Sequence, residues 1–384
     1  MSSNTPADWD IRSPGVLADQ RQAYDRMRDS CPVARDGAGH WTLFRHADVK
    51  QVLLDHQRFS NQVSRHISVP NGMDPPEHTP FRQLIEPYFN EQRVAWFKPL
   101  CRAIADELAQ GLQGKAQIEL MADFALPFAL RAQCAFMGWP QTLQQPLGEW
   151  ARKNQQATLE QDRTALAQLA AEFEAIVVEQ LALRRAPDHV VGADITSELM
   201  QEQVNGRGLT DAEIASILRN WTVGEVGTLA SAIGILAHYL AGDATLQQQL
   251  REQPQRLYYA NDEIQRMHNP LLENRRRATC PVELGGRKIG QDERVYLNWV
   301  AANRDPAVFA QPDQFSWERN EQDNLLYGAG VHVCPGAPMA RMELVEVMDS
   351  LLQHSSALQL AADKTPVLAR YPATGYAALW VTLG

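Results

Sequence analysis

The sequence predicts a mainly α-helical protein with a small β portion. From about Pro80 onward, apolar residues recur at the three-to-four-residue interval of helices, and clusters of glycine and proline separate the helical segments. Short strand-like segments occur near the start of the chain and in its last third. Neither a tandem repeat nor a long linker divides the chain, so we expect residues 1–384 to form a single domain.

The same patterns place the expected elements along the chain. The N-terminal part should form an amphipathic helix at 14–28, a hairpin at 32–44 with Asp36-Gly37 as its turn, a short helix at 47–55 and a mobile loop at 59–70. Further helices are expected at 92–112, 122–137, 143–156, 162–185 and 193–203, and further strands at 282–284, 287–289, 294–297 and 378–382.

The longest expected helix covers residues 210–241. Thr210 and Glu213 form a capping box at its start, and a glycine stops it at its end. At 1.5 Å per residue the helix is about 45 Å long, enough to cross a whole domain. Gly224 and Gly227 lie on one face, and each costs about 1 kcal/mol relative to alanine. This cost indicates that a bound group or another helix approaches that face closely.

Composition excludes several classes of partner. The net charge of −10 argues against binding to nucleic acid or to an anionic membrane surface. The five cysteines form no Cys-x-x-Cys pair, which fits a reducing compartment. The N-terminus is polar, and no run of about 18 apolar residues occurs. We therefore expect a cytoplasmic protein without a signal peptide or a membrane span.

A glycine-rich stretch, YGAGVHVCPGAPMARME at 327–343, carries the chemistry. Cys334 precedes a helix, whose free N–H groups and dipole favour a thiolate. Such a thiolate is a nucleophile or a metal ligand, and a buried structural cysteine is the alternative. His332 lies two residues before the sulfur and is poorly placed to act as its base. The glycines at 328, 330 and 336 leave room for a large flat group, which favours a ligand.

This stretch resembles the heme-binding loop of the cytochrome P450 family. The family pattern is matched by Tyr327, where phenylalanine is usual, and by Gly330, Cys334, Gly336, Ala340, Arg341 and Glu343. The resemblance implies the P450 fold, with heme b between the long central helix and the cysteine loop. It further implies that Cys334 ligates the iron as a thiolate, which favours O–O cleavage, and that Tyr327 and Gly224 contact the cofactor.

Two basic motifs match the residues that hold heme propionates in this family. His78 and Arg82 lie four residues apart and share one helix face, an arrangement that taken alone is more often solvent-exposed. Arg276 aligns with a further propionate ligand, and Arg277 is the alternative. A guanidinium suits a carboxylate because it can donate two parallel hydrogen bonds. The resemblance adds His332 to the same group.

Glu263 and Arg266 match the family's Glu-x-x-Arg motif, whose role is structural. By default such a pair on a helix is exposed and contributes only a few tenths of a kcal/mol. The family often adds a third, basic partner. Gln314 stands at that position, so Arg319 is the substitute that we expect.

The long helix departs from the family's distal pattern. Thr228 aligns with the threonine that relays protons to dioxygen, but Gly227 stands where an acid is usual and Glu225 where a glycine is usual. Glu225 and Thr228 are three residues apart on one face. A displaced acid–alcohol pair is therefore geometrically possible.

The resemblance implies a monooxygenase that inserts one oxygen atom into a small organic substrate by hydroxylation or oxidative dealkylation. The sequence contains neither a dinucleotide fingerprint nor an iron–sulfur cysteine cluster, so we expect electrons from a ferredoxin or flavodoxin with its reductase. The alternatives are a peroxygenase that uses hydrogen peroxide and a non-catalytic heme sensor or carrier. Expected substrate contacts lie in the loop 59–72, the helices 142–185 and the turn 372–376. Arg65, His66, Trp150 and Tyr376 are single candidates, although each is more often a surface or core residue.

Overall fold

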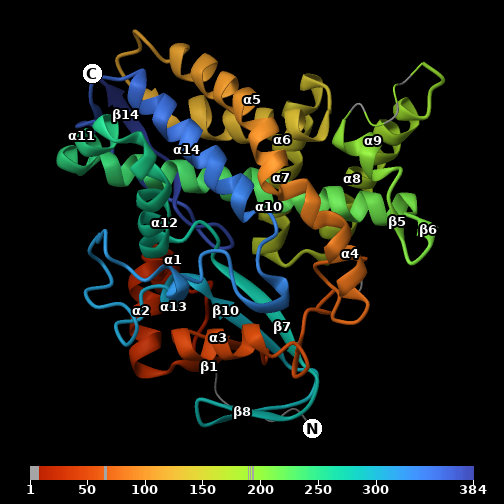
Figure 1. Ribbon diagram of the computed structural model, residues 1–384. Helices are drawn as coiled ribbons and strands as arrows, with labels where there is room; N and C mark the ends of the chain where they lie inside the picture. The colour runs from red at the N-terminus through yellow and green to blue at the C-terminus, as the bar shows by residue number, and fades with distance from the viewer. Residues whose placement is uncertain (1–7, 65–66, 189, 191, 193) are drawn as a thin grey trace.

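A computed structural model describes residues 8–384 except 65–66, 189, 191 and 193. Figure 1 shows a large helical part above a smaller part in which short helices flank a sheet. The helices of eight or more residues are α2 Gln20–Ser30, α3 His46–Leu54, α4 His78–Ile85, α5 Glu91–Gln110, α6 Leu126–Met137, α7 Gln144–Glu160, α8 Arg163–Arg184, α10 Asp211–Ala241, α11 Ala244–Glu252, α12 Leu257–His268 and α14 Ala337–Gln353. The shorter ones are α1 Pro14–Ala18, α9 Ile195–Leu199 and α13 Trp299–Ala302.

The main sheet joins two distant parts of the chain. Its strand order is β1 Val33–Arg35, β2 Trp41–Leu43, β10 Arg294–Asn298, β7 Glu273–Ala278 and β3 Phe59–Ser60. β10 runs parallel to β2 and antiparallel to β7, with Val295 opposite both Trp41 and Arg276. The remaining strands form four small sheets: β4 Ile118–Glu119 with β11 Leu358–Leu360 and β14 Trp380–Leu383, β5 Gln203–Val204 with β6 Arg207–Gly208, β8 Val282–Leu284 with β9 Arg287–Ile289, and β12 Val367–Leu368 with β13 Tyr376–Ala378.

Helix α10 crosses the centre of the helical part (Figure 1). The predicted capping box is present, because the Thr210 hydroxyl accepts from the Glu213 N–H and the Glu213 carboxylate accepts from the Thr210 N–H. Arg207 also binds that carboxylate, at 2.7 and 2.8 Å, and fixes the first turn. Of the described helices, α10 alone is long and apolar enough to cross a membrane, and most of its apolar stretch is buried inside the protein. This burial places its side chains in the core and beside the site.

Glu263 and Arg266 are a buried pair, as the match to the Glu-x-x-Arg motif implies, and not the exposed pair that their spacing alone suggests. Arg266 is 0% exposed and Glu263 is 3% exposed. The guanidinium of Arg266 donates to both carboxylate oxygens at 2.8 and 3.0 Å. Arg319 binds the same carboxylate at 3.0 Å, which confirms it as the third partner in place of Gln314. The two guanidinium groups balance the charge of the Glu263 carboxylate and offset the cost of burying it in the low-dielectric interior.

Some expected elements differ from the structure. The helix expected at 14–28 is broken at Asp19, whose carboxylate caps α2 by accepting from the Gln22 N–H. The helix expected at 193–203 ends as α9 at Leu199, and a hairpin follows whose turn, Asn205-Gly206, has positive φ at both residues. The loop expected at 59–70 begins with β3. Strand β7 was not expected, because its sequence is arginine-rich and lacks an apolar alternation.

Glu263→Ala should give a protein that unfolds at lower temperature and binds little heme. The change leaves Arg266 buried without its partner, which typically costs about 3–5 kcal/mol, a large share of a typical stability of about 5–15 kcal/mol. The matched control is Glu149→Ala, which removes an exposed helix pair with Lys153 at 3.6 Å and should change the melting temperature little. Equal melting temperatures and heme contents for the two variants would contradict the structural role.

Candidate functional site

One cavity of about 470 Å³ brings together every site residue expected from the sequence. Its lining includes His78, Arg82, Gly224, Glu225, Thr228, Arg276, Tyr327, His332 and Cys334. These residues come from α4, α10, β7 and the loop before α14, which are far apart along the chain. A volume of this size lies within the range of small-molecule and cofactor pockets.

The loop before α14 presents the Cys334 thiol to the cavity. Gly328 and Gly330 have φ of +75° and +72°, and a Cβ at Gly330 would lie 2.5 Å from the carbonyl oxygen of Leu53. Glycine is therefore required there by both conformation and contact. The N–H groups of Gly336 and Ala337 donate to the sulfur. Pro335, which lies between Cys334 and these residues, has no N–H to donate. Burial raises the pKa of Cys334, and these two donors oppose that rise.

Four basic side chains converge on one side of the cavity, and we call them the basic cluster: His78, Arg82, Arg276 and His332. The His78 and His332 rings are 4.5 Å apart. Burial, followed by the charge of Arg276, lowers the pKa of His332 to about 3. Among the described residues Arg276 forms no salt bridge, and its guanidinium donates only to the carbonyl of Arg275, at 2.9 Å.

The basic cluster fits a dianion. Burial lowers the pKa of Arg276 to about 10. The carboxylate of Asp74 lies 3.9 Å from Nε2 of His332 and supplies one negative charge. A buried guanidinium without a counter-ion is costly, so the propionates of heme would compensate charge that the protein leaves unbalanced. Together with the thiol and the cavity volume, this donor set fits heme b.

Strand alternation settles which arginine faces the cavity. Arg276 is buried and lines the cavity, whereas the side chain of Arg277 points to the other face of β7 and pairs with Asp292 at 2.5 Å. Arg277, the alternative expected from sequence, therefore does not belong to the basic cluster.

The two glycines of α10 have different neighbours. A Cβ on Gly224 would meet nothing within 4 Å, and Gly224 lines the cavity. A Cβ on Gly227 would lie 3.4 Å from Nε2 of Gln155 on α7, and Gly227 does not belong to the lining. Of the two alternatives left open by the sequence, close helix packing applies to Gly227, and an open cavity face applies to Gly224.

The carboxyl of Glu225 lies beside that of Glu343 on α14, and both line the cavity. Burial raises the pKa of Glu225 to about 7 and that of Glu343 well above its usual value. No hydrogen bond links Glu225 to Thr228 in the described part of the chain. Sequence reasoning assigned no function to Glu343, although its place in the cysteine-loop motif, nine residues after Cys334, was a signal.

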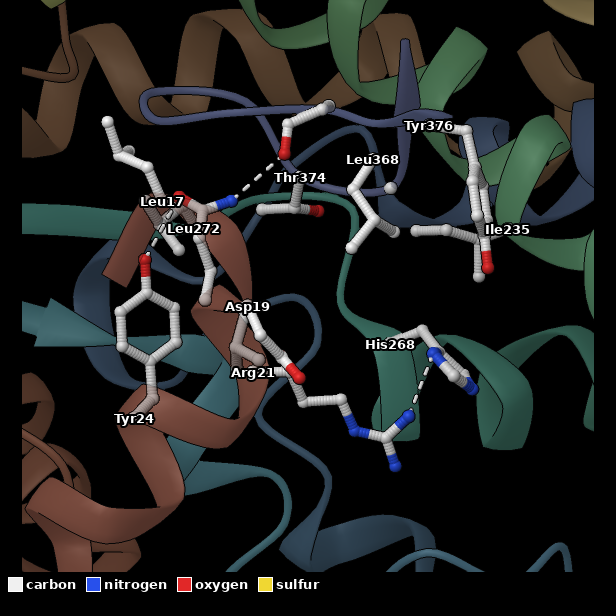
Figure 2. A pocket seen from close by; sticks show the side chains of 14 residues that line it. Leu17, Asp19, Arg21, Tyr24, Ile235, His268, Leu272, Leu368, Thr374 and Tyr376 are labelled. Carbon is white, nitrogen blue, oxygen red and sulfur yellow. Dashed lines mark hydrogen bonds between the residues drawn. The ribbon is translucent and has the colours of Figure 1, made fainter. Parts of the chain in front are cut away.

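Of the single candidates for substrate contact, Trp150 and Tyr376 do not line the main cavity. Trp150 belongs to the core and donates to the carbonyl of Leu169 at 2.8 Å. Tyr376, at the end of the turn 372–376, lines a second, smaller cavity between α2, α10 and α12 (Figure 2). Arg65 and His66 lie outside the described residues. The loop 59–72 does contribute to the main cavity, through Asn61 and Ser68 among others.

Comparisons with known proteins agree with this geometry. Residues 139–367 match the sequence profile of the family described as Cytochrome P450. "Probable cytochrome P450 127A1" of Sinorhizobium fredii is 31% identical over 342 residues, covering 87% of this chain and 81% of that protein. Erythromycin C-12 hydroxylase of Saccharopolyspora erythraea is 29% identical, covering 93% and 96%. Among solved structures, a mutant of P450 EryK in complex with erythromycin B aligns with a TM-score of 0.85 at 26% identity and covers 96% of both chains.

Cys334→His should abolish the absorption band near 450 nm of the reduced carbon-monoxide complex that the resemblance implies. That band requires an electron-rich thiolate ligand, which imidazole does not reproduce. Cys134→Ser is the control, because Cys134 is buried in α6 and does not line the cavity. A 450 nm band retained in Cys334→His would remove Cys334 as the ligand.

Arg276→Leu should weaken heme binding by at least about 10-fold, since it removes a charge-assisted hydrogen-bond donor from a partly buried anion site. Arg277→Leu is the matched control, because it changes the adjacent residue of the same strand but faces Asp292. Heme affinity is measured by titrating the heme-depleted protein and following the Soret band. Similar losses in both variants would contradict the assignment of Arg276.

Proposed function

Since this chain belongs to the cytochrome P450 family, we propose that it inserts one oxygen atom of dioxygen into a small organic substrate by hydroxylation or oxidative dealkylation. Family membership makes the chain a monooxygenase with heme b as its cofactor. The observation that carries the proposal is the single cavity in which Cys334, the basic cluster and the residues of α10 face one another.

Each group of residues has a defined part in holding the cofactor. Cys334 is the thiolate ligand, and the basic cluster binds the propionates. Tyr327 is half-buried, accepts from the Cys334 N–H at 2.9 Å and has the Arg341 guanidinium 4.5 Å from its ring, which supports a place against the cofactor edge. Gly224 leaves α10 without a side chain where a flat group would lie. When bound, heme with its thiolate ligand supplies the activation of dioxygen.

Proton movement falls to Glu225 and Thr228. A carboxyl whose pKa is raised to about 7 can release and take up a proton near neutral pH. Glu343 holds that carboxyl from the opposite helix and can replenish its proton, since its own pKa is also raised. The Thr228 hydroxyl, one turn farther along α10, would pass the proton on within the cavity.

Electrons are proposed to come from a ferredoxin or flavodoxin with its reductase, in the cytoplasm. The 384 residues contain no motif for binding a nicotinamide, a flavin or an iron–sulfur cluster. A second candidate, a peroxygenase that takes hydrogen peroxide in place of dioxygen and electrons, is favoured by the Glu225 carboxyl in the cavity itself. Product formed from peroxide alone, at a rate matching that with reductant and dioxygen, would select this second candidate.

Glu225→Gln should slow product formation and divert reducing equivalents to peroxide or water, because the variant keeps its size but loses its titratable proton. A positioned acid contributes about 10²- to 10⁴-fold, and water can replace part of that. Thr228→Ala should act in the same direction, and the double variant should be less than additive. The measurement is product formed per reductant consumed.

The control is Thr222→Ala, because the Thr222 hydroxyl is satisfied by the Leu218 carbonyl of its own helix and lies outside the cavity. It should leave the ratio of product to reductant unchanged. Unchanged coupling in Glu225→Gln together with clear uncoupling in Thr228→Ala would remove Glu225 from the mechanism and leave it a packing role.

A further inference from the structure

We infer that the substrate oxidised in this cavity is an organic acid whose carboxylate is bound by Arg219 of α10. The inference rests on the proposed function, because it concerns the molecule bound above the cofactor. It adds the chemical class of that molecule and the residue that selects it. The argument combines the contacts of Arg219, the charges in the cavity lining and the distance of Arg219 from Thr228.

Arg219 is half-buried in the cavity lining and has unused donors. Among the described residues, its guanidinium, which has five N–H groups, donates one hydrogen bond, to the carbonyl of Ile67 at 2.6 Å. It forms no salt bridge in the described part of the chain, and Glu174 on α8 acts on it only at longer range. Burial disfavours the charged guanidinium and lowers its pKa, and the charge of Glu174 compensates this only in part. A carboxylate ligand would supply that compensation with two parallel hydrogen bonds.

Hydrogen bonds between α10 and the loop 67–69 fix the position of Arg219. The Ser216 hydroxyl accepts from the Val69 N–H at 2.8 Å and donates to the Ile67 carbonyl at 3.2 Å. Asn220 donates to the Val69 carbonyl at 3.0 Å. Both neighbours of Arg219 on this side of the helix are therefore tied to the loop, and the guanidinium is held before a ligand arrives. Such preorganisation lowers the entropic cost of binding.

Among the described residues of the lining, Arg219 is the cation outside the basic cluster that has no carboxyl beside it. The basic cluster is assigned to the propionates of heme. Arg275 also lines the cavity, but it lies on the face of β7 opposite to Arg276 and has the Glu273 carboxyl beside it. The two carboxyl residues in the described lining, Glu225 and Glu343, lie against each other. Ser68 and Asn220, which are hydrogen-bonded to each other, place neutral polar groups next to Arg219. An acid is therefore favoured over an amine.

The position of Arg219 also limits the site of oxidation. It precedes Thr228 by nine residues, which is about 13.5 Å along the helix axis. The lining also includes apolar side chains, among them Val63 and Val223, and Val223 lies between Arg219 and Thr228 along α10. An acid held at Arg219 would therefore lay an apolar body along α10 and present an atom far from its carboxylate to the cofactor. Oxidation next to the carboxylate is disfavoured by this distance.

The test uses the heme-loaded protein, with dodecanoate and its methyl ester as probes. Binding is measured by calorimetry and by the low-spin to high-spin shift of the Soret band. Dodecanoate should bind wild-type protein at least about 10-fold more tightly than Arg219→Met, since the variant loses a charge-assisted contact. The methyl ester should bind both proteins within about threefold, and Arg219→Lys should recover part of the affinity for the acid.

A matched control and the product pattern complete the test. Arg185→Met removes an arginine that pairs with Asp211 outside the cavity, and it should leave dodecanoate binding unchanged. Turnover should oxidise dodecanoate in the half of the chain remote from the carboxylate. Equal acid affinity in wild type and Arg219→Met, tighter binding of the ester than of the acid by wild type, or no binding of the acid would overturn the inference. Oxidation of the methyl ester but not of dodecanoate would also overturn the inference, while leaving the monooxygenase function intact.

Discussion

The buried charge network of Glu263, Arg266 and Arg319 is the interaction on which the cavity depends. Residues 303–320 contain neither a helix nor a strand, yet they lead directly into the loop that carries Cys334. Their carbonyl groups need donors, and the two arginines provide them. Arg266 donates to the carbonyls of Asn303 and Pro312, and Arg319 to those of Gln311 and Gln314. Glu263 orients both guanidinium groups, so one carboxylate on α12 fixes a long irregular segment.

The cavity differs from this network, because the buried guanidinium of Arg276 forms no salt bridge among the described residues. The basic cluster is held in place by α4, β7 and the cysteine loop. Its nearest carboxylates are Glu86, 2.9 Å from Arg82, and Asp74, 3.9 Å from His332. A dianionic cofactor would complete the balance, and its binding energy would then add to the stability of the folded chain. The network of Glu263, Arg266 and Arg319 and the basic cluster both contact the segment that carries Cys334. Both therefore favour one position of Cys334.

Sequence patterns predicted the helices well where local signals agree with the fold. The capping box of α10, the hairpin at 32–44 and the nine cavity residues follow from short-range rules or from motif resemblance. The failures have physical causes. Strand β7 is specified by pairing with β10 and β3, which its arginines do not reveal. The turn 372–376 lies beside a second cavity, where Ala373 forms an isolated antiparallel β-bridge with Leu271. The two residues are about a hundred positions apart, so no local pattern indicates the contact.

Side-chain environments were the least predictable part of the site. The family resemblance favoured Arg276 over Arg277 and led us to expect Arg319 in place of Gln314, but residue spacing alone encodes neither choice. The first depends on which face of β7 is covered, and the second on the path of an irregular segment. The partnership of Glu225 with Glu343 joins α10 to α14 and required the packing of two helices that are far apart in sequence. Burial then raises both pKa values, and the neighbouring Glu225 carboxyl raises that of Glu343 further.

The departure at Gly227 is better understood as a relocation of the acid than as its loss. Two residues along a helix correspond to a rotation of about 200°, so a side chain at 225 and one at 227 leave opposite flanks of α10. At 227 a side chain would meet Gln155 of α7, whereas Glu225 meets Glu343 of α14, the helix that follows Cys334. On that flank the carboxyl is paired with a second one in a buried environment, where two acids readily share a proton. Compared with the family pattern, α10 therefore lacks a carboxyl on the flank toward α7. It carries instead Glu225, paired with Glu343, on the flank toward α14 and the cysteine loop.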